Sequence, residues 1–216
     1  RAYIQVPGSW NKFSGNPEQS GYGTATYRLQ ILIPQETRLA FFVPRVHTAY
    51  EMFVNGELVA GAGTVGKNLE DSDPRYMPQI VLFESRAGVN EILINVSNFH
   101  HRSGGMLESI QLGSEENILR LQTGSLAREL ILFGSLVTIG FYHLALYIFR
   151  KKNRSSLYFG LFSVLVGIRT LLVGQRFFSF LFPDFSWEIA HKIQTLSYYL
   201  GVPLILMFFL SMYPGY

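Results

Sequence analysis

Cysteine is absent from this chain of 216 residues. Disulfide bonds therefore cannot hold any part of it together, and the sequence carries no sign of the redox state of its compartment. Acidic residues are scarce in the second half, where only Glu129, Asp184 and Glu188 follow residue 123. The basic residues of that half thus lack the charge-rich surroundings of a soluble recognition surface, which argues against a nucleic-acid partner.

Patterns that carry catalysis or bind metals are also missing. The acids of the first half are scattered, without the paired spacing that general acid–base chemistry needs. His100 and His101 are adjacent and point apart, and no HExxH spacing supports a zinc site. The acidic stretch 70–73 favours a solvated loop over a calcium site, and the sequon at Asn95 falls in a predicted strand. We therefore expect no enzyme activity, cofactor or metal in this part of the protein.

Long uncharged runs occupy the second half. Residues 130–149 (LILFGSLVTIGFYHLALYIF) carry no formal charge, and their length is close to the ~20 residues that cross a bilayer. A second run, 156–173, contains only Arg169, and a third, 193–212, contains no charge. Helices satisfy their own backbone hydrogen bonds in lipid, so the sequence predicts three transmembrane helices within a membrane domain, 130–216, with the lipid bilayer as partner.

Four cations lie between the first two runs, and they predict the orientation. They are Arg150, Lys151, Lys152 and Arg154. Cations close to the ends of a span stay in the cytoplasm far more often than they cross, so the N-terminal region is predicted to be extracytoplasmic. The second connection, 174–188, is rich in aromatic residues, which suits the outer interface.

Two ionisable residues within the runs each allow two interpretations. Arg169 either extends toward the outer interface, which we favour, or lines the interior of the helix bundle. His143 is either an uncharged imidazole hydrogen-bonded to another helix, which we also favour, or part of a proton relay. A transporter subunit is a further alternative, but the runs lack the paired acids and the broken symmetric helices of a transport site.

Alternating hydrophobicity marks the first half as β-structure. In 27–33 the odd positions, Tyr27, Leu29, Ile31 and Ile33, are apolar and predicted to face one way. Asn55-Gly56 separates two apolar segments, as in a hairpin with a type I′ turn. Further strands are predicted at 38–43, 80–83, 92–96 and 110–112. These short strands predict an all-β sandwich over 1–120, joined to the membrane domain by a linker, 121–129.

Polar and aromatic residues in the predicted loops form a candidate ligand-binding rim, because aromatic platforms beside planar hydrogen-bonding groups suit a sugar or another small polar ligand. Two of them have simpler interpretations: Trp10 could fill one end of the sandwich, and Arg102 could anchor the loop before Gly104-Gly105. The candidate residues are Trp10, Arg75, Tyr76, Asn98, His100, His101 and Arg102.

Several motifs carry a resemblance to a known family. VPGSWN, YGTATYRLQI, MFVNGELVAGAGTVG, NEILINVSNFHHRSGG and IQLG, within residues 6–113, resemble the galactose-binding-like jelly roll that also forms the sugar-binding domain of some β-glycosidases. LYIFRKKNRSSLYFGLFSVLVGIRTLL and YYLGVPLILMFFLSMYP follow it. In this order of parts, the chain resembles the bacterial seven-transmembrane receptors with diverse intracellular signalling modules.

The resemblance implies a fold class and a function. The fold is an all-β jelly-roll sandwich ectodomain followed by three of a probable seven transmembrane α-helices, in a multi-pass protein of the bacterial cytoplasmic (inner) membrane with a periplasmic N-terminal domain. The function is that of a receptor that binds a small polar or carbohydrate ligand and signals to a cytoplasmic kinase, cyclase or phosphatase domain that this sequence lacks. A second copy of the chain, forming a homodimer, is considered as a further partner. The alternative function is a membrane-anchored carbohydrate-binding accessory module of a carbohydrate-processing enzyme.

Overall fold

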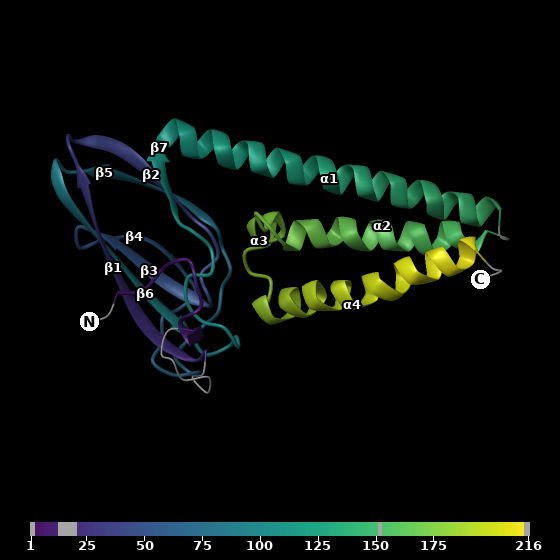
Figure 1. Ribbon diagram of the computed structural model, residues 1–216, viewed down its shortest axis with the longest axis horizontal. Helices are drawn as coiled ribbons and strands as arrows, with labels where there is room; N and C mark the ends of the chain where they lie inside the picture. Colours follow the sequence, from purple (N-terminus) through teal and green to yellow (C-terminus); the bar gives the residue numbers. More distant parts are fainter. Residues whose placement is uncertain (1–2, 13–20, 151–152, 214–216) are drawn as a thin grey trace. The chain divides into compact units, whose positions relative to one another are not determined.

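The computed structural model describes residues 3–12, 21–150 and 153–213. The chain divides into two compact units, Arg1–Gln122 and Thr123–Tyr216. The first unit is a β-sandwich and the second is a group of apolar helices (Figure 1). One helix, α1, begins in the first unit and continues into the second.

In its described residues, the first unit contains a short 3-10 helix and seven strands arranged in two antiparallel sheets. One sheet has the order β1-β6-β3-β4, and the other has the order β5-β2-β7. The elements are η1 (Trp10–Lys12), β1 (Gly23–Ile33), β2 (Thr37–Val43), β3 (Ala49–Val54), β4 (Glu57–Ala62), β5 (Gln79–Ser85), β6 (Gly88–Asn98) and β7 (Gln111–Ser114).

The hairpin between β3 and β4 forms at the predicted place. Asn55 and Gly56 have φ values of 52° and 86°, in the left-handed region that a type I′ turn requires. Asn55 also ties this turn to β6, because its backbone N–H donates to the carbonyl of Glu91 at 2.8 Å.

The core of the sandwich lies between the two sheets. Met52 and Val96 from the larger sheet are fully buried, as is Val43 from the smaller one. The rings of Phe41 and Phe83 stack at 4.7 Å between centroids. Alternate residues of the strands point inward, as the period of two requires.

The predicted apolar face of β1 is not buried along its whole length. Leu29 is 57% exposed, although Ile33 on the same face of β1 is buried. The reason is that β1 is an edge strand of a four-stranded sheet that faces a sheet of only three strands. The smaller sheet cannot cover the whole of the larger one, so alternation along an edge strand does not guarantee burial.

Strand β2 is covered on both faces. Ala40 and Phe42 point away from the main core and are buried against Ile118, near the start of α1. Ile118 itself is only 2% exposed. The beginning of α1 is therefore part of the folded sandwich and is not a free tether.

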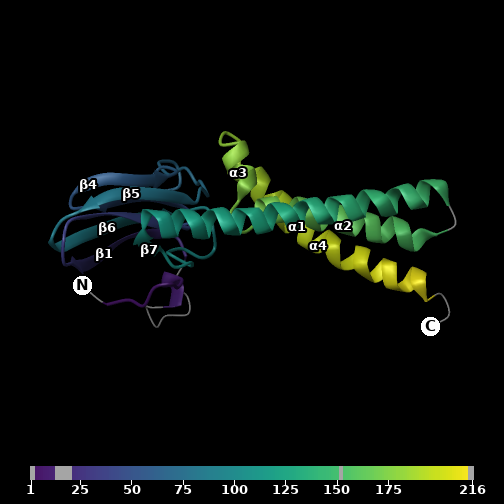
Figure 2. The ribbon, with the colours of Figure 1, turned by 90° about the horizontal axis from the view of Figure 1, so that it is seen from above.

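Among the residues that the structure describes, the second unit has three helices that are long and apolar enough to cross a membrane. They are α1 (Glu115–Phe149), α2 (Arg154–Leu172) and α4 (Trp187–Met212), and the short helix α3 (Phe177–Leu181) precedes α4. Figure 2 shows α3 set off from the long helices. The predicted fold class, a β-sandwich followed by transmembrane helices, is confirmed.

The segment predicted as a linker, 121–129, lies inside α1. No proline interrupts it, and Glu115 and Glu116 occupy the first turn, where negative charge favours the partial positive charge of a helix N-terminus. Gly124 lowers the helix propensity, but a single glycine costs only about 1 kcal/mol. The segment therefore continues as a helix into the apolar run.

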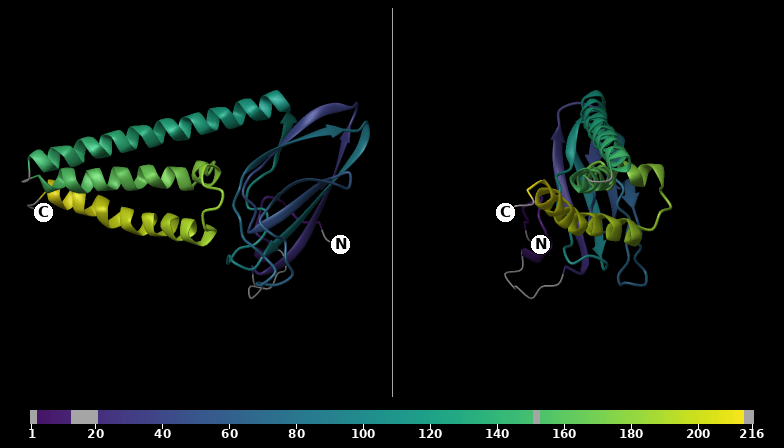
Figure 3. Two further views of the ribbon diagram at one scale, coloured as in Figure 1. Left: turned by 180° about the vertical axis from the view of Figure 1, so that it is seen from behind. Right: turned by 90° about the vertical axis from the view of Figure 1, so that its right-hand side faces the viewer.

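Helix α2 lies between α1 and α4 (Figures 1 and 3). Its contact with α1 depends on glycines, because a Cβ on Gly160 would come within 3.0 Å of the carbonyl oxygen of Gly140 and 2.9 Å of Leu144 Cγ. A Cβ on Gly167 would come within 3.0 Å of Val137. Small residues let helix backbones approach closely in a membrane, where dispersion contacts replace the hydrophobic effect.

The two ionisable residues of the spans both lie at contacts between helices. Arg169 of α2 donates hydrogen bonds to the carbonyl of Gln194 and to Ser197 Oγ of α4, so it joins the two helices instead of extending to the interface. His143 of α1 packs edge-on against the ring of Phe159 of α2. The hydrogen bond that we favoured for His143 is not made by its Nδ1 to any residue that the structure describes.

The turn between α2 and α3 is built around Glu129 of α1. Its carboxylate accepts hydrogen bonds from the backbone N–H of Gln175, at 3.0 and 3.2 Å. Gly174 has a φ of 64°, and a Cβ there would come within 2.1 Å of this carboxylate. Glu129, the last residue of the predicted linker, thus holds a turn of the second unit in place.

Candidate functional site

The predicted rim residues gather at one end of the sandwich. Three connections meet there: 44–48 between β2 and β3, 63–78 between β4 and β5, and 99–110 between β6 and β7. Backbone hydrogen bonds join them, including Arg75 N–H to the carbonyl of Thr48 at 3.0 Å and a pair between His47 and Gly105, both at 3.3 Å. We call these three connections the rim loops.

Trp10 is anchored beside the rim loops. Its indole Nε1 donates to the carbonyl of Gly21 at 3.0 Å. A Cβ on Gly104 would come within 2.3 Å of the indole ring, and Gly105 has a φ of 107°. The two glycines thus leave room for the ring, and Trp10, which packs against the main core, fills this end of the sandwich.

Asn98 is fully buried at the end of β6, and its amide holds the chain around it. Its Nδ2 donates to the carbonyl of Gly21 at 2.7 Å and to that of His101 at 2.5 Å. Its Oδ1 accepts from the backbone N–H of His101 at 3.0 Å. These bonds fix the loop that carries His100, His101 and Arg102.

Three aromatic rings meet inside the rim. The ring of His47 stacks on Tyr76, with 5.0 Å between centroids, and meets His101 edge-on at 4.6 Å. His47 and Tyr76 are buried, whereas His101 is half-buried. His47 is not among the predicted rim residues, because it is a lone histidine in the short β2–β3 connection and belongs to no motif. The contact joins two predicted residues, Tyr76 and His101, from different loops.

The remaining rim residues are closer to solvent. His100 is half-buried, and its Nδ1 lies 3.4 Å from Ser72 Oγ. Arg75 and Arg102 are exposed. The backbone carbonyl of Arg102 accepts from Asn11 Nδ2 at 3.1 Å, which holds its loop against the segment that carries Trp10.

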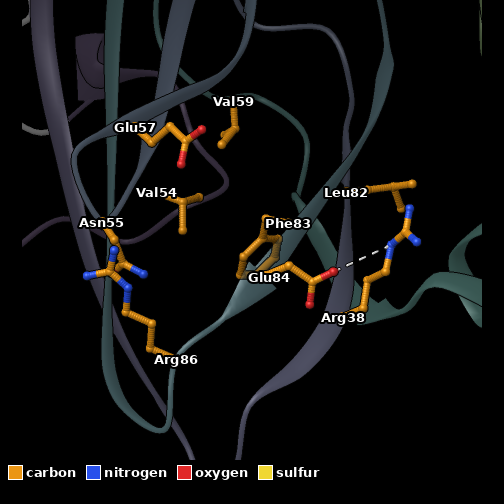
Figure 4. A pocket seen from close by; sticks show the side chains of 9 residues that line it. All are labelled: Arg38, Val54, Asn55, Glu57, Val59, Leu82, Phe83, Glu84 and Arg86. Atoms are coloured by element: carbon orange, nitrogen blue, oxygen red, sulfur yellow. Dashed lines mark ion pairs between the residues drawn. The ribbon is translucent and has the colours of Figure 1, made fainter.

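A polar pocket of about 310 Å³ lies at the opposite end of the sandwich, where the β3–β4 and β5–β6 turns are found. Figure 4 shows its side chains, which come from both sheets. None of its residues was predicted as a site residue, because their charges are isolated in turns and strand ends and form no recognisable motif. We call it the turn-end pocket; it is lined by Arg38, Val54, Asn55, Glu57, Val59, Leu82, Phe83, Glu84 and Arg86.

The four predicted topology residues lie between α1 and α2. Arg150 is exposed directly after α1, and Arg154 begins α2. Lys151 and Lys152 lie outside the described residues.

The helical unit is similar to a known protein family. Residues 127–214 match the family model for 7TM diverse intracellular signalling. The match confirms the family resemblance. The apolar helices and this match make the chain an integral membrane protein with a sensor role. No curated protein matches the sequence significantly.

Solved structures resemble the sandwich only distantly. A GH2 β-galacturonidase from Eisenbergiella tayi is 16% identical with a TM-score of 0.40, over 51% of this chain and 20% of that one. A β-glucuronidase from an uncultured Clostridium sp. is 14% identical with a TM-score of 0.40, over 50% and 22%. The β-glucuronidase of Ruminococcus gnavus is 12% identical with a TM-score of 0.39, over the same shares. This chain spans about a fifth of each glycosidase, and the likeness supports no inference about activity.

Proposed function

We propose that this chain is the sensing part of a bacterial inner-membrane receptor, in which the β-sandwich lies outside the cytoplasm and binds a small polar ligand of the carbohydrate type at the rim. Binding there changes the arrangement of the membrane helices, and an intracellular signalling module responds. The observation that carries the proposal is helix α1, which begins as part of the sandwich and contains the first span.

The rim offers groups that suit such a ligand. Arg75 and Arg102 are exposed, and the half-buried imidazoles of His100 and His101 directly precede Arg102 on the β6–β7 loop. Planar donors beside aromatic rings are the usual means of binding sugar hydroxyls and carboxylates. Asn98 and Trp10 serve this surface by holding the loops, through their shared bonds to the carbonyl of Gly21.

Transmission depends on how α1 is attached. Ile118 is buried against β2, and Arg38 Nε of β2 lies 3.1 Å from Glu115 Oε2. A shift of the sandwich strands is therefore passed to the first turns of a helix that has no break before Phe149. A ligand can drive such a shift only if it binds one arrangement more tightly than the other.

The orientation is tested by labelling single cysteines, which the natural chain lacks entirely. Glu70→Cys lies in an exposed rim loop, and Asn153→Cys is exposed between α1 and α2. In intact spheroplasts, a membrane-impermeant maleimide should label Glu70→Cys at once and Asn153→Cys only after the membrane is opened. Equal labelling of both sites without opening would refute the proposal.

The ligand is tested with the full chain in lipid nanodiscs. D-galactose, D-glucose and D-glucuronate serve as probes, and thermal unfolding is followed because a bound ligand raises apparent stability by about 2.7 kcal/mol at a hundred times its dissociation constant. At least one sugar should raise the unfolding temperature, and Arg102→Gln should remove the effect. Arg28→Gln is the matched control, since Arg28 pairs with Glu91 on the sheet. If none of the sugars changes the unfolding temperature, the proposal of a carbohydrate ligand is contradicted, but the proposed orientation is not.

A further inference from the structure

The turn-end pocket has a charge distribution that the proposed function does not use. It contains two arginines and two glutamates, but they are not all paired. Arg38 lies 3.9 Å from Glu84 and 3.1 Å from Glu115, so its charge is compensated. Within the described part of the chain, neither Glu57 nor Arg86 belongs to an ion pair. The pocket thus offers one unpaired carboxylate and one unpaired guanidinium.

Both unpaired groups lie on a wall that buried hydrogen bonds make rigid. Asn90 is fully buried; its Oδ1 accepts from the backbone N–H of Arg86 and from Asn55 Nδ2, both at 2.9 Å. Its Nδ2 donates to the carbonyl of Arg86 at 2.7 Å. The turn that carries Arg86 and the turn before Glu57 are therefore fixed to each other. Figure 4 shows Glu57 and Arg86 on one side, with Arg38 and Glu84 on the other.

The space between these charges has an apolar lining. Val54 and Phe83 are 4% and 8% exposed, and Val59 is half-buried beside them. A volume of about 310 Å³ is at the lower end of the roughly 300 to 1,000 Å³ typical of small-molecule sites. The occupant that fits is therefore small, carries one charge of each sign and has a compact apolar part.

We propose that the turn-end pocket binds a small zwitterion of the α-amino acid class. Its carboxylate pairs with the guanidinium of Arg86, its ammonium group pairs with the carboxylate of Glu57, and an aliphatic side chain lies over Val54, Val59 and Phe83. An isolated anion or cation would leave one of the two protein charges uncompensated, whereas a zwitterion compensates both. The planar guanidinium also suits the two oxygens of a carboxylate.

The pocket is directly connected to the start of α1. Arg38 lines it and also pairs with Glu115, the first residue of that helix. An occupant that reorients Arg38 or Glu84 would change this pair. This connection to signalling rests on the proposed function, whereas binding at the pocket does not.

The test is calorimetric titration of the full chain in nanodiscs with L-leucine. Isovalerate and isoamylamine are the matched probes, because each keeps the aliphatic part and only one of the two charges. L-leucine should bind at least ten-fold more tightly than either. Arg86→Gln and Glu57→Gln should each weaken L-leucine binding by roughly ten- to a hundred-fold, the range expected for one charged hydrogen bond. Both side chains are exposed, so both variants should fold.

Two control variants separate this site from the rim. Arg102→Gln and Glu70→Gln remove an exposed charge of each sign from the rim loops and should leave L-leucine binding unchanged. The proposal is overturned if L-leucine does not bind, if either singly charged probe binds as well, or if the rim variants weaken binding as much as the pocket variants. A sugar effect that Arg102→Gln removes tests the rim separately, so either site can fail without the other.

Discussion

Replacing Asn98 with alanine tests whether buried hydrogen bonds hold the rim loops. The substitution removes three hydrogen bonds, to Gly21 and to both backbone groups of His101. At about 1 kcal/mol for each bond, with a further cost for the buried backbone groups left unpaired, the free energy of unfolding of the sandwich should fall by about 2 to 4 kcal/mol.

Asn95→Ala is the matched control. Asn95 lies on the same strand, β6, but its side-chain Oδ1 accepts an exposed hydrogen bond, from Thr26 Oγ1 at 2.8 Å. Surface changes of this kind usually alter stability by about 0.5 kcal/mol or less. The two variants thus remove the same amide from one strand in a buried and an exposed setting.

The assay is urea unfolding of the full chain in micelles, followed by tryptophan fluorescence. The chain has two tryptophans, Trp10 in the sandwich and Trp187 in α4, so both variants are made in a Trp187→Phe background. Trp10 then reports on the sandwich alone, and it shares the carbonyl of Gly21 with Asn98. For Asn98→Ala, the urea concentration at the midpoint of unfolding should fall, while the dependence of the free energy of unfolding on urea concentration stays unchanged. A loss for Asn98→Ala no greater than that for Asn95→Ala would refute the reasoning.

Three further outcomes follow from the fold. Ile118→Ala should lower the free energy of unfolding by about 2 to 4 kcal/mol in the same assay, because Ile118 is buried against β2. Leu119 is 42% exposed, so Leu119→Ala should lower it by less than about 1 kcal/mol. Equal losses would show that α1 is not docked. Gly160→Val should lower the thermal stability of the helices in micelles, because the valine side chain would meet Gly140 and Leu144. Gly134→Val is the control, since a side chain at residue 134 would enter open space. Equal thermal stability of the two variants would argue against close α1–α2 packing. Burial raises the pKa of Tyr50 well above its usual value of about 10, so only the unfolded chain ionises this phenol just above pH 10, and stability should fall as the pH rises beyond it. Tyr50→Phe should reduce that alkaline loss in urea titrations, and an unchanged pH dependence would contradict this origin.

The sequence predicted the fold class well where the physical requirement is local. Twenty uncharged residues at 130–149 can hardly be anything but a membrane helix, and Asn55-Gly56 predicts a hairpin because few other pairs adopt its backbone angles. The candidate rim was less complete. Tyr76 and His101 were selected, but His47, whose ring lies between theirs, was not.

The sequence did not predict burial or contacts that depend on neighbours from distant parts of the chain. Leu29 is exposed because the facing sheet is narrower, and Arg169 bonds to α4 because Gln194 and Ser197 lie within its reach.

The sequence by itself determined which segments enter lipid and which form strands, because an uncharged run and an alternating apolar pattern are both properties of residues that are neighbours along the chain. Only the tertiary structure decided which polar groups meet. Glu57 from β4 and Arg86 from a turn after β5 line one pocket, and Arg38 pairs with both Glu84 and the first residue of α1. Such groups come together through strand order and register, which depend on the packing of two sheets and leave no pattern along the chain.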